Sequence, residues 1–227
     1  EYQFDAELAQ SLNVRGILDM NLGIFAEAEG DFIRALAIFE KLGARPSAMS
    51  VVNNLGLIAI FRGEYEKAAE RYQDAIRRAQ EAGQTHLEME FTSNLGEALM
   101  RIGAYDDAIA RLVWVVDAAH ERRFPQISET YRFLAEAYLG TQLLDSALEA
   151  AENSLKAGYD IDYQEYIAGA LCVLGQVLAA SGLVSVIERE DETLVFTVQK
   201  CFQEADTMFT ELDMSGERAR KLRSWAQ

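Results

Sequence analysis

Three residue types are scarce in the 227-residue sequence, which contains two prolines, two cysteines and two histidines. Because proline breaks helix interiors, its scarcity favours helix along the whole chain. Cys172 and Cys201 fit no metal-ligand or redox spacing, and both lie in apolar helical patterns. They are therefore predicted to be free, buried thiols in a reducing, cytoplasmic protein. His86 and His120 have no partner at a metal-ligand spacing, so no metal site is expected.

Basic charge and long apolar runs are also lacking. The 21 basic residues face 37 acidic ones, which gives a net charge of −16. Because nucleic acids and anionic membranes are bound by concentrated basic surfaces, neither is an expected direct partner. The basic residues near the end of the chain form only a small cluster, Arg218, Arg220, Lys221 and Arg223. No apolar run is long enough to span a bilayer. The sequence starts without Met and inside a helical pattern, so we expect a piece of a longer protein.

Catalytic motifs are missing as well. There is no glycine-rich phosphate loop and no G-x-S-x-G element, and "HLEME" lacks the second histidine of a zinc protease. The acidic "YDIDY" offers too few oxygens at the right offsets for a calcium loop. We therefore predict neither an enzyme nor a cofactor site.

What the sequence does contain is a repeat of forty residues. Glycine recurs at Gly16, Gly56 and Gly96, and the series continues through Ala135 to Gly175. Alanine follows the same step at Ala28, Ala68 and Ala108, then at Ala147 one residue early. Several kinds of position sharing one period indicate stacked structural repeats.

Each repeat is predicted to be a pair of helices. In the second copy, apolar residues recur at helical spacing over residues 47–61 and again over 64–82. Gly63 is expected to end the first helix as a C-cap glycine. Gly56 sits in a helix interior, where glycine costs about 1 kcal/mol. We expect the paired helix to cross closely there, with Ala68 and Tyr72 on the other side of the contact.

These residues resemble the tetratricopeptide repeat. The signature stands as Leu12, Gly16, Ala28, Phe32 and Ala35 in the first copy, and as Leu55, Gly56, Ala68, Tyr72 and Ala75 in the second. The resemblance covers roughly residues 5–182 and implies an all-α, right-handed α-solenoid of about five repeats. The forty-residue period is similar to the long repeats of kinesin light chain. Phrases such as "ALAIFEKLGARPSAMSVVNNLGLIA" look most like repeats of bacterial signal-transduction ATPases, adenylate cyclases and transcriptional activators.

The predicted organisation has three parts. Residues 1–182 hold four complete repeats and the first helix of a fifth. Residues 183–197 form an inserted acidic loop, for which a lid or a partner-docking hook is the alternative to a plain solvated loop. If Ala205 is the repeat alanine of the fifth unit, the insertion has eighteen residues. Residues 198–227 supply a C-terminal helix and a capping or truncated helix.

The resemblance places partner binding on the concave face formed by the first helices. Its groove positions, with the neighbouring asparagines, give Asn13, Asn53, Asn54, Leu57, Ile60, Phe61, Asn94, Glu97, Arg101, Arg132 and Glu136. Amide side chains both donate and accept, so they suit a peptide backbone. Two readings remain open here: asparagines merely tolerated on a wet face, and charged residues that pair with each other.

Two functions follow as hypotheses. The first is a non-catalytic protein-interaction module, or scaffold, that docks a peptide or helix. The alternative is a regulatory sensor domain of a larger bacterial signalling protein, which binds an effector or a neighbouring domain. Self-association through the terminal helices is a further candidate, because the uncapped end of a solenoid is apolar.

Overall fold

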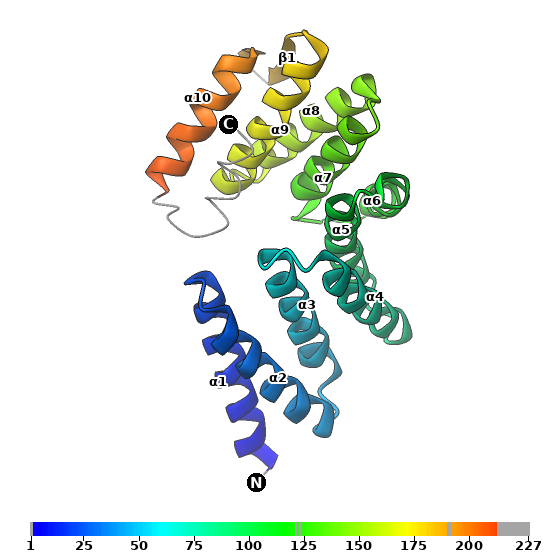
Figure 1. Ribbon diagram of the computed structural model, residues 1–227, viewed down its shortest axis with the longest axis vertical. Helices are drawn as coiled ribbons and strands as arrows, with labels where there is room; N and C mark the ends of the chain where they lie inside the picture. Colours follow the sequence, from blue (N-terminus) through cyan, green and yellow to red (C-terminus); the bar gives the residue numbers. More distant parts are fainter. Residues whose placement is uncertain (1, 121, 123, 190–191, 213–227) are drawn as a thin grey trace. The chain divides into compact units, whose positions relative to one another are not determined.

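The computed structural model describes residues 2–120, 122, 124–189 and 192–212. Within these residues the chain forms ten helices and one two-stranded sheet (Figure 1). The helices are α1 (Tyr2–Asn21), α2 (Phe25–Lys41), α3 (Arg45–Phe61), α4 (Tyr65–Glu81), α5 (Thr85–Ile102), α6 (Tyr105–Ala119), α7 (Ile127–Gly140), α8 (Leu144–Asp160), α9 (Gln164–Ser181) and α10 (Val198–Glu211). The strands are β1 (Ser185–Arg189) and β2 (Glu192–Phe196). The chain divides into two compact units, Glu1–Ala98 and Leu99–Gln227.

Short turns built on left-handed glycines separate the helices. Gly63 has φ +73°, and its N–H donates to the carbonyl of Ile60 at 3.0 Å. The next N–H, of Glu64, donates to the carbonyl of Ala59 at 2.8 Å. Together these two bonds satisfy the last carbonyls of α3, as in a Schellman motif. Gly23, Gly43, Gly83 and Gly103 share the positive φ, so the predicted C-cap role of glycine recurs at the ends of α1 to α5.

In the first unit, apolar stripes of α1, α2 and α3 merge into one core. Phe32 and Phe39 of α2 pack in a single cluster with Leu12 of α1 and with Val51 and Leu55 of α3. The signature alanines lie inside it: Ala28 and Ala35 have no exposed surface. Small side chains at these positions let the helices approach closely, which explains why alanine repeats there.

In the second unit the core runs from the end of α5 through α7, α8 and α9 to α10. A pair of reciprocal hydrogen bonds joins α7 to α8: the hydroxyls of Ser128 and Ser154 each donate to the other's carbonyl at 2.8 Å. Both serines are fully buried. This pairing satisfies two polar side chains that would otherwise be costly inside a core.

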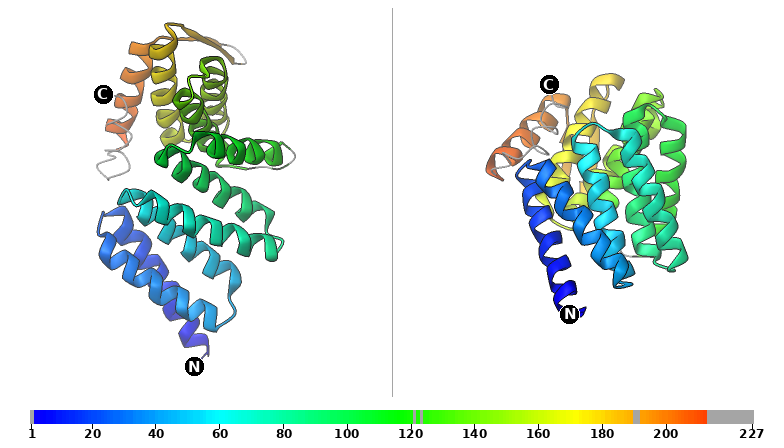
Figure 2. Two further views of the ribbon diagram at one scale, coloured as in Figure 1. Left: turned by 45° about the vertical axis from the view of Figure 1, so that its right-hand side comes forward. Right: turned by 60° about the horizontal axis from the view of Figure 1, so that its bottom comes forward.

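The segment 183–197, predicted to be an acidic loop, instead contains the β1–β2 hairpin (Figure 2). Its side chains alternate: Ile187 and Phe196 are buried, whereas Val186 and Val195 are about half exposed and pair across the strands. This period of two is a strand signal. The mostly acidic run at 188–192 obscures this alternation in the sequence, because consecutive charged residues suggest a solvated loop. The predicted capping helix of the tail, including Trp225, lies outside the described residues.

After the hairpin, α10 packs along α9 and takes the place of the missing second helix of the fifth repeat (Figures 1 and 2). A β-carbon on Gly175 would lie 2.9 Å from the ring of Phe202. Sixteen residues separate Gly56 from Tyr72, and twenty-seven separate Gly175 from Phe202. The insertion is therefore eleven residues, not the eighteen predicted by taking Ala205 as the repeat alanine.

Candidate functional site

The predicted groove residues fall on first helices of both units. In the first unit they are on α1, α3 and α5, and in the second on the end of α5 and on α7. These residues form a buried group and a partly exposed group. Asn53, Ile60 and Arg132 are at most 7% exposed, so they serve mainly the interior. Partly exposed groove residues remain for contact with a partner: Asn13, Asn54, Leu57, Phe61, Asn94, Glu97, Arg101 and Glu136.

Four asparagines of the first unit form what we call the amide ladder: Asn13, Asn53, Asn54 and Asn94. Asn54 Nδ2 donates to Asn13 Oδ1 at 3.3 Å, which links α3 to α1. Asn94 Nδ2 donates to Asn53 Oδ1 at 2.8 Å, which links α5 to α3. Both bonds span 41 residues, one repeat plus one position. The asparagines are therefore more than tolerated polar residues, since they connect consecutive first helices.

The ladder leaves hydrogen-bonding capacity for a partner. An amide offers two donors and one carbonyl oxygen with two lone pairs. Among the described residues, Asn54 Oδ1 and Asn94 Oδ1 accept no hydrogen bond. Both side chains are only partly buried. The two carbonyl oxygens, one repeat apart, can accept backbone N–H groups from an extended chain that crosses the first helices.

Glu90 on α5 is a member of this region that the groove positions do not predict. Its Oε1 accepts a hydrogen bond from Asn53 Nδ2 at 3.3 Å. Burial raises the pKa of the Glu90 carboxyl, and the charge of His86 opposes this only in part. The ladder amide of Asn53 is therefore hydrogen-bonded to a carboxyl group that takes up a proton more readily than an exposed carboxyl group does.

Tyr72 reaches the same region from α4. Its hydroxyl is buried and has no hydrogen-bond partner among the described residues. Burial, together with the charges of Glu97 and Glu90, holds the pKa of Tyr72 well above its usual value. The ring passes α3 at Gly56, as the repeat pattern predicts. In the first repeat Phe32 occupies the equivalent place against Gly16, so the hydroxyl is particular to the second repeat.

Apolar groups accompany the amides on α3. Leu57 and Phe61 are partly exposed, and the Phe61 ring stacks on Phe25 with centroids 5.7 Å apart and planes 17° apart. Ile60, also a predicted groove residue, is 3% exposed and belongs to the interior. Leu57 and Phe61 are therefore the apolar side chains of α3 that a ligand can reach.

Charged residues of the second unit form what we call the charge cluster: Arg101, Glu129, Arg132 and Glu136. Arg132 Nη1 lies 2.7 Å from Glu136 Oε1, and Arg101 Nη1 lies 3.1 Å from Glu136 Oε2. Arg132 Nη2 lies 3.4 Å from Glu129. The side chains of Glu136 and Arg132 are 12% and 6% exposed. The sequence left open whether these charged residues contact a partner or pair with each other. Glu136 pairs with Arg101 and Arg132.

The packing of Arg132 explains why this side chain, which is 6% exposed, is interior. Its guanidinium lies 4.3 Å above the ring of Phe133. A β-carbon on Gly169 would lie 3.2 Å from Arg132 Cδ, so the side chain is packed against α9. An arginine held by two carboxylates, an aromatic ring and a helix contributes to packing as well as to charge.

Within the described residues, no group of three or more His, Cys, Asp or Glu side chains is placed to hold a metal ion. Burial raises the pKa of Cys172 and of Cys201 to about 12, so both thiols stay protonated near neutral pH. No helix in the described part of the chain combines the length and apolar character needed to cross a bilayer.

Known proteins resemble this chain in its repeat sequence and in its fold. The family model for the tetratricopeptide repeat matches residues 7–81. No curated protein matches the chain in sequence. The structure of BtubC (BKLC) from P. vanneervenii is similar with a TM-score of 0.67 and 18% identity, over 97% of this chain and 81% of that one.

Two further structures resemble the chain. A Rap protein complexed with Competence and Sporulation Factor has a TM-score of 0.68 and 14% identity, over 97% of this chain and 63% of the Rap protein. A Signal Transduction ATPase with Numerous Domains from Pyrococcus horikoshii, which has a tetratricopeptide repeat sensor, has a TM-score of 0.62 and 18% identity, over 88% of this chain and 30% of the ATPase. At such low identities, these structural likenesses show the fold alone. They confirm the predicted all-α repeat class.

Proposed function

We propose that this chain, a tetratricopeptide-repeat protein, is a non-catalytic interaction module that binds an extended peptide or short helix across α1, α3 and α5. One observation carries the proposal. The amide ladder holds Asn54 and Asn94 one repeat apart, each with a carbonyl oxygen that accepts no hydrogen bond among the described residues. A peptide backbone supplies N–H groups in series, and burying them requires such acceptors.

The side chains around the ladder suggest the chemistry of the ligand. Leu57 and Phe61 offer partly exposed apolar surface on α3, beside Asn54. The 37 acidic residues outnumber the 21 basic ones, so an acidic ligand would meet repulsion. We therefore expect a peptide with an apolar segment and a neutral or basic net charge.

The charge cluster has a smaller part in this proposal than the sequence predicts. Glu136 is occupied by Arg101 and Arg132, and a ligand could reach these charges only by breaking their pairing. Glu97, on α5, stays a candidate contact because it is partly exposed. The expected contact set is thus Asn13, Asn54, Leu57, Phe61, Asn94 and Glu97.

The test selects ligands and then removes the acceptors. A random peptide library is panned on the full chain, and selected peptides are titrated against Asn54→Ala combined with Asn94→Ala. Loss of two hydrogen bonds of about 1 kcal/mol each predicts affinity weaker by roughly ten- to thirtyfold. Gln73→Ala, an exposed amide on α4, is the matched control and should bind like wild type. Equal binding by the double variant, or failure to select any peptide, would contradict the proposal.

A sensor role in a larger signalling protein is the second candidate. It is supported by the likeness to the ATPase that has a tetratricopeptide repeat sensor, of which this chain spans 30%. The two free, buried cysteines fit the cytoplasm, where such a protein would work. The sequence encoded before Glu1 decides between the roles, because a nucleotide- or DNA-binding module there would favour the sensor.

A further inference from the structure

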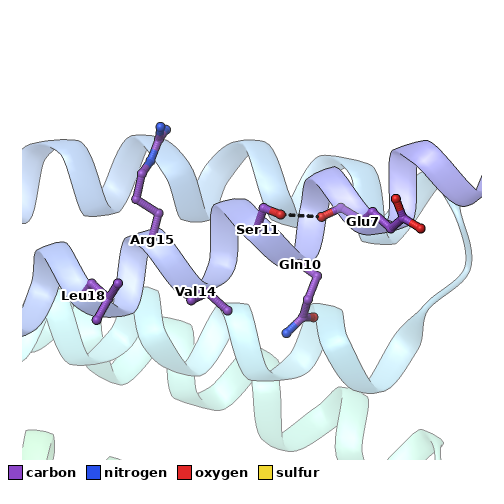
Figure 3. Close-up of a pocket in the computed structure, with 6 residues that line it drawn as sticks. All are labelled: Glu7, Gln10, Ser11, Val14, Arg15 and Leu18. Atoms are coloured by element: carbon purple, nitrogen blue, oxygen red, sulfur yellow. Dashed lines mark hydrogen bonds between the residues drawn. The ribbon is translucent and has the colours of Figure 1, made fainter.

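The outward side of α1 carries exposed apolar residues at regular intervals. We call Phe4, Leu8, Ser11, Arg15 and Leu18 of α1, together with Leu22 in the turn that follows, the α1 stripe. Phe4 is 73% exposed, Leu18 58% and Leu22 74%. A shallow hollow of ≈ 620 Å³ on α1 is lined by Glu7, Gln10, Ser11, Val14, Arg15 and Leu18. In Figure 3, Arg15 and Gln10 point to opposite sides of the helix. Apolar side chains gathered on one helix side indicate a surface that binds another element.

The next repeat shows what normally covers this side. Forty residues after Leu8, Ser11, Arg15 and Leu18 stand Ala48, Val51, Leu55 and Ile58. All four are at most 4% exposed and share a core with α2. The α1 stripe therefore occupies the side that α3 buries against the preceding second helix. A helix is the element whose shape fits it.

The centre of the stripe is polar, unlike its counterpart on α3. Ser11 and Arg15 stand where α3 has Val51 and Leu55. Arg15 Nε and Nη2 donate hydrogen bonds to the two oxygens of the Asp31 carboxylate on α2, while the arginine side chain stays 60% exposed. A helix with a continuous apolar stripe, such as α2, would bury this guanidinium without adding a partner. The covering helix must be apolar at both ends and polar in the middle.

The α1 stripe itself has that pattern, and its spacing is self-complementary. Steps of four, three, four, three and four residues match the seam of two paired helices. When a second α1 runs antiparallel, Phe4 faces Leu22 of the second copy, Leu8 faces Leu18, and Ser11 faces Arg15. The residue numbers in each facing pair add up to 26, as a two-fold axis requires. Arg15 has donors left over for the Ser11 hydroxyl, because a guanidinium has five.

We propose that two copies of this chain associate through antiparallel pairing of their α1 stripes. The stripe extends about 27 Å, given a rise of 1.5 Å per residue. A single helix pair lies at the low end of specific interface sizes, so the dimer is reversible. Each copy carries a net charge of −16, and salt screens the repulsion between copies. Association therefore strengthens as ionic strength rises.

Sedimentation velocity over a concentration series, from low to high micromolar, tests the dimer. Wild type should shift from monomer to dimer, and Leu8→Glu or Leu18→Glu should weaken association by at least about tenfold. Leu143→Glu is the matched control, since Leu143 is 52% exposed but lies outside the stripe. All these sites are exposed, so circular dichroism should show unchanged helix content. A monomer at every concentration, or a dimer unaffected by Leu18→Glu, would overturn the proposal.

Disulfide trapping tests the antiparallel register. Leu8→Cys and Leu18→Cys proteins are mixed and oxidised, while the buried native thiols, with pKa values of about 12, react slowly. Antiparallel pairing predicts cross-links between the two different variants. Cross-links confined to identical variants would indicate parallel pairing and overturn the register, and no cross-link in either case would overturn the contact itself.

Discussion

The ring of Tyr72 lies directly against the backbone of Gly56. A β-carbon built on Gly56 would lie 2.5 Å from Tyr72 Cε1 and 2.8 Å from Cζ. The same relationship joins Gly16 to Phe32, at 2.7 Å. Glycine in a helix interior is unfavourable by about 1 kcal/mol relative to alanine. At Gly16, Gly56 and Gly175 the glycine is explained by an aromatic ring of the following helix that needs the space.

We expect Gly56→Ala to destabilise the protein by about 1–2 kcal/mol. Overpacking typically costs about 1–3 kcal/mol, and the better helix propensity of alanine offsets part of that. Chemical denaturation followed by circular dichroism measures the change. Gly30→Ala is the control, because nothing lies within 4 Å of a β-carbon there, and it should stabilise α2 by about 0.5–1 kcal/mol. Equal effects of the two substitutions would refute the packing explanation.

The repeat period made this contact predictable from sequence, since Gly56 and Tyr72 each recur in register with their equivalents in the first repeat. Helix bounds followed for the same reason: residues 47–61 were expected for the helix found at Arg45–Phe61. Partner choice among side chains was not predictable. Asn53 and Asn54 share a helix, yet one bonds to α5 and the other to α1, which depends on the rotation between helices.

Residues outside the repeat pattern were the harder part. Glu90 is no groove position, so its contact with Asn53 has no counterpart from which to infer it. The β1–β2 hairpin occurs once, and the mostly acidic sequence at 188–192 outweighed the alternation of Ile187 and Phe196. In both cases an internal repeat offers no second copy for comparison, and local composition suggested a different environment.

The turn after α7 offers a stabilising substitution. Gln142 has φ 61°, in the left-handed region that the other repeats fill with glycine, for example Gly63 at 73°. Because a side chain costs roughly 1 kcal/mol or more there, Gln142→Gly should raise the free energy of unfolding by about 0.5–1 kcal/mol. The reverse change, Gly63→Gln, should lower it by a similar amount. Urea denaturation midpoints compare the two, and opposite signs are required for this interpretation to hold.

Glu90 makes a pH-dependent prediction. Burial raises its pKa in the folded protein, so the folded state favours the protonated carboxyl. The Glu90 carboxyl therefore does not lower the free energy of unfolding below the pKa that it has in the unfolded chain. It lowers that free energy increasingly as pH rises through its pKa in the folded protein. Glu90→Gln keeps an acceptor for Asn53 and should raise the melting temperature at about pH 7.5 but not at about pH 4. Glu66→Gln, exposed on α4, is the control; a pH-independent gain at Glu90 would contradict the assignment.

The charge cluster predicts a large loss on removing its central carboxylate. Glu136→Ala leaves Arg101 and Arg132, whose side chains are 16% and 6% exposed, without their shared partner. Breaking a buried ion pair by removing one member costs about 3–5 kcal/mol, and the partial exposure of Arg101 lowers our expectation to about 2–4 kcal/mol. Lys41→Ala, which breaks the exposed pair with Asp5, should cost less than about 1 kcal/mol. Chemical denaturation distinguishes the two, and a loss below about 1 kcal/mol at Glu136 would mean that water replaces the carboxylate around both arginines.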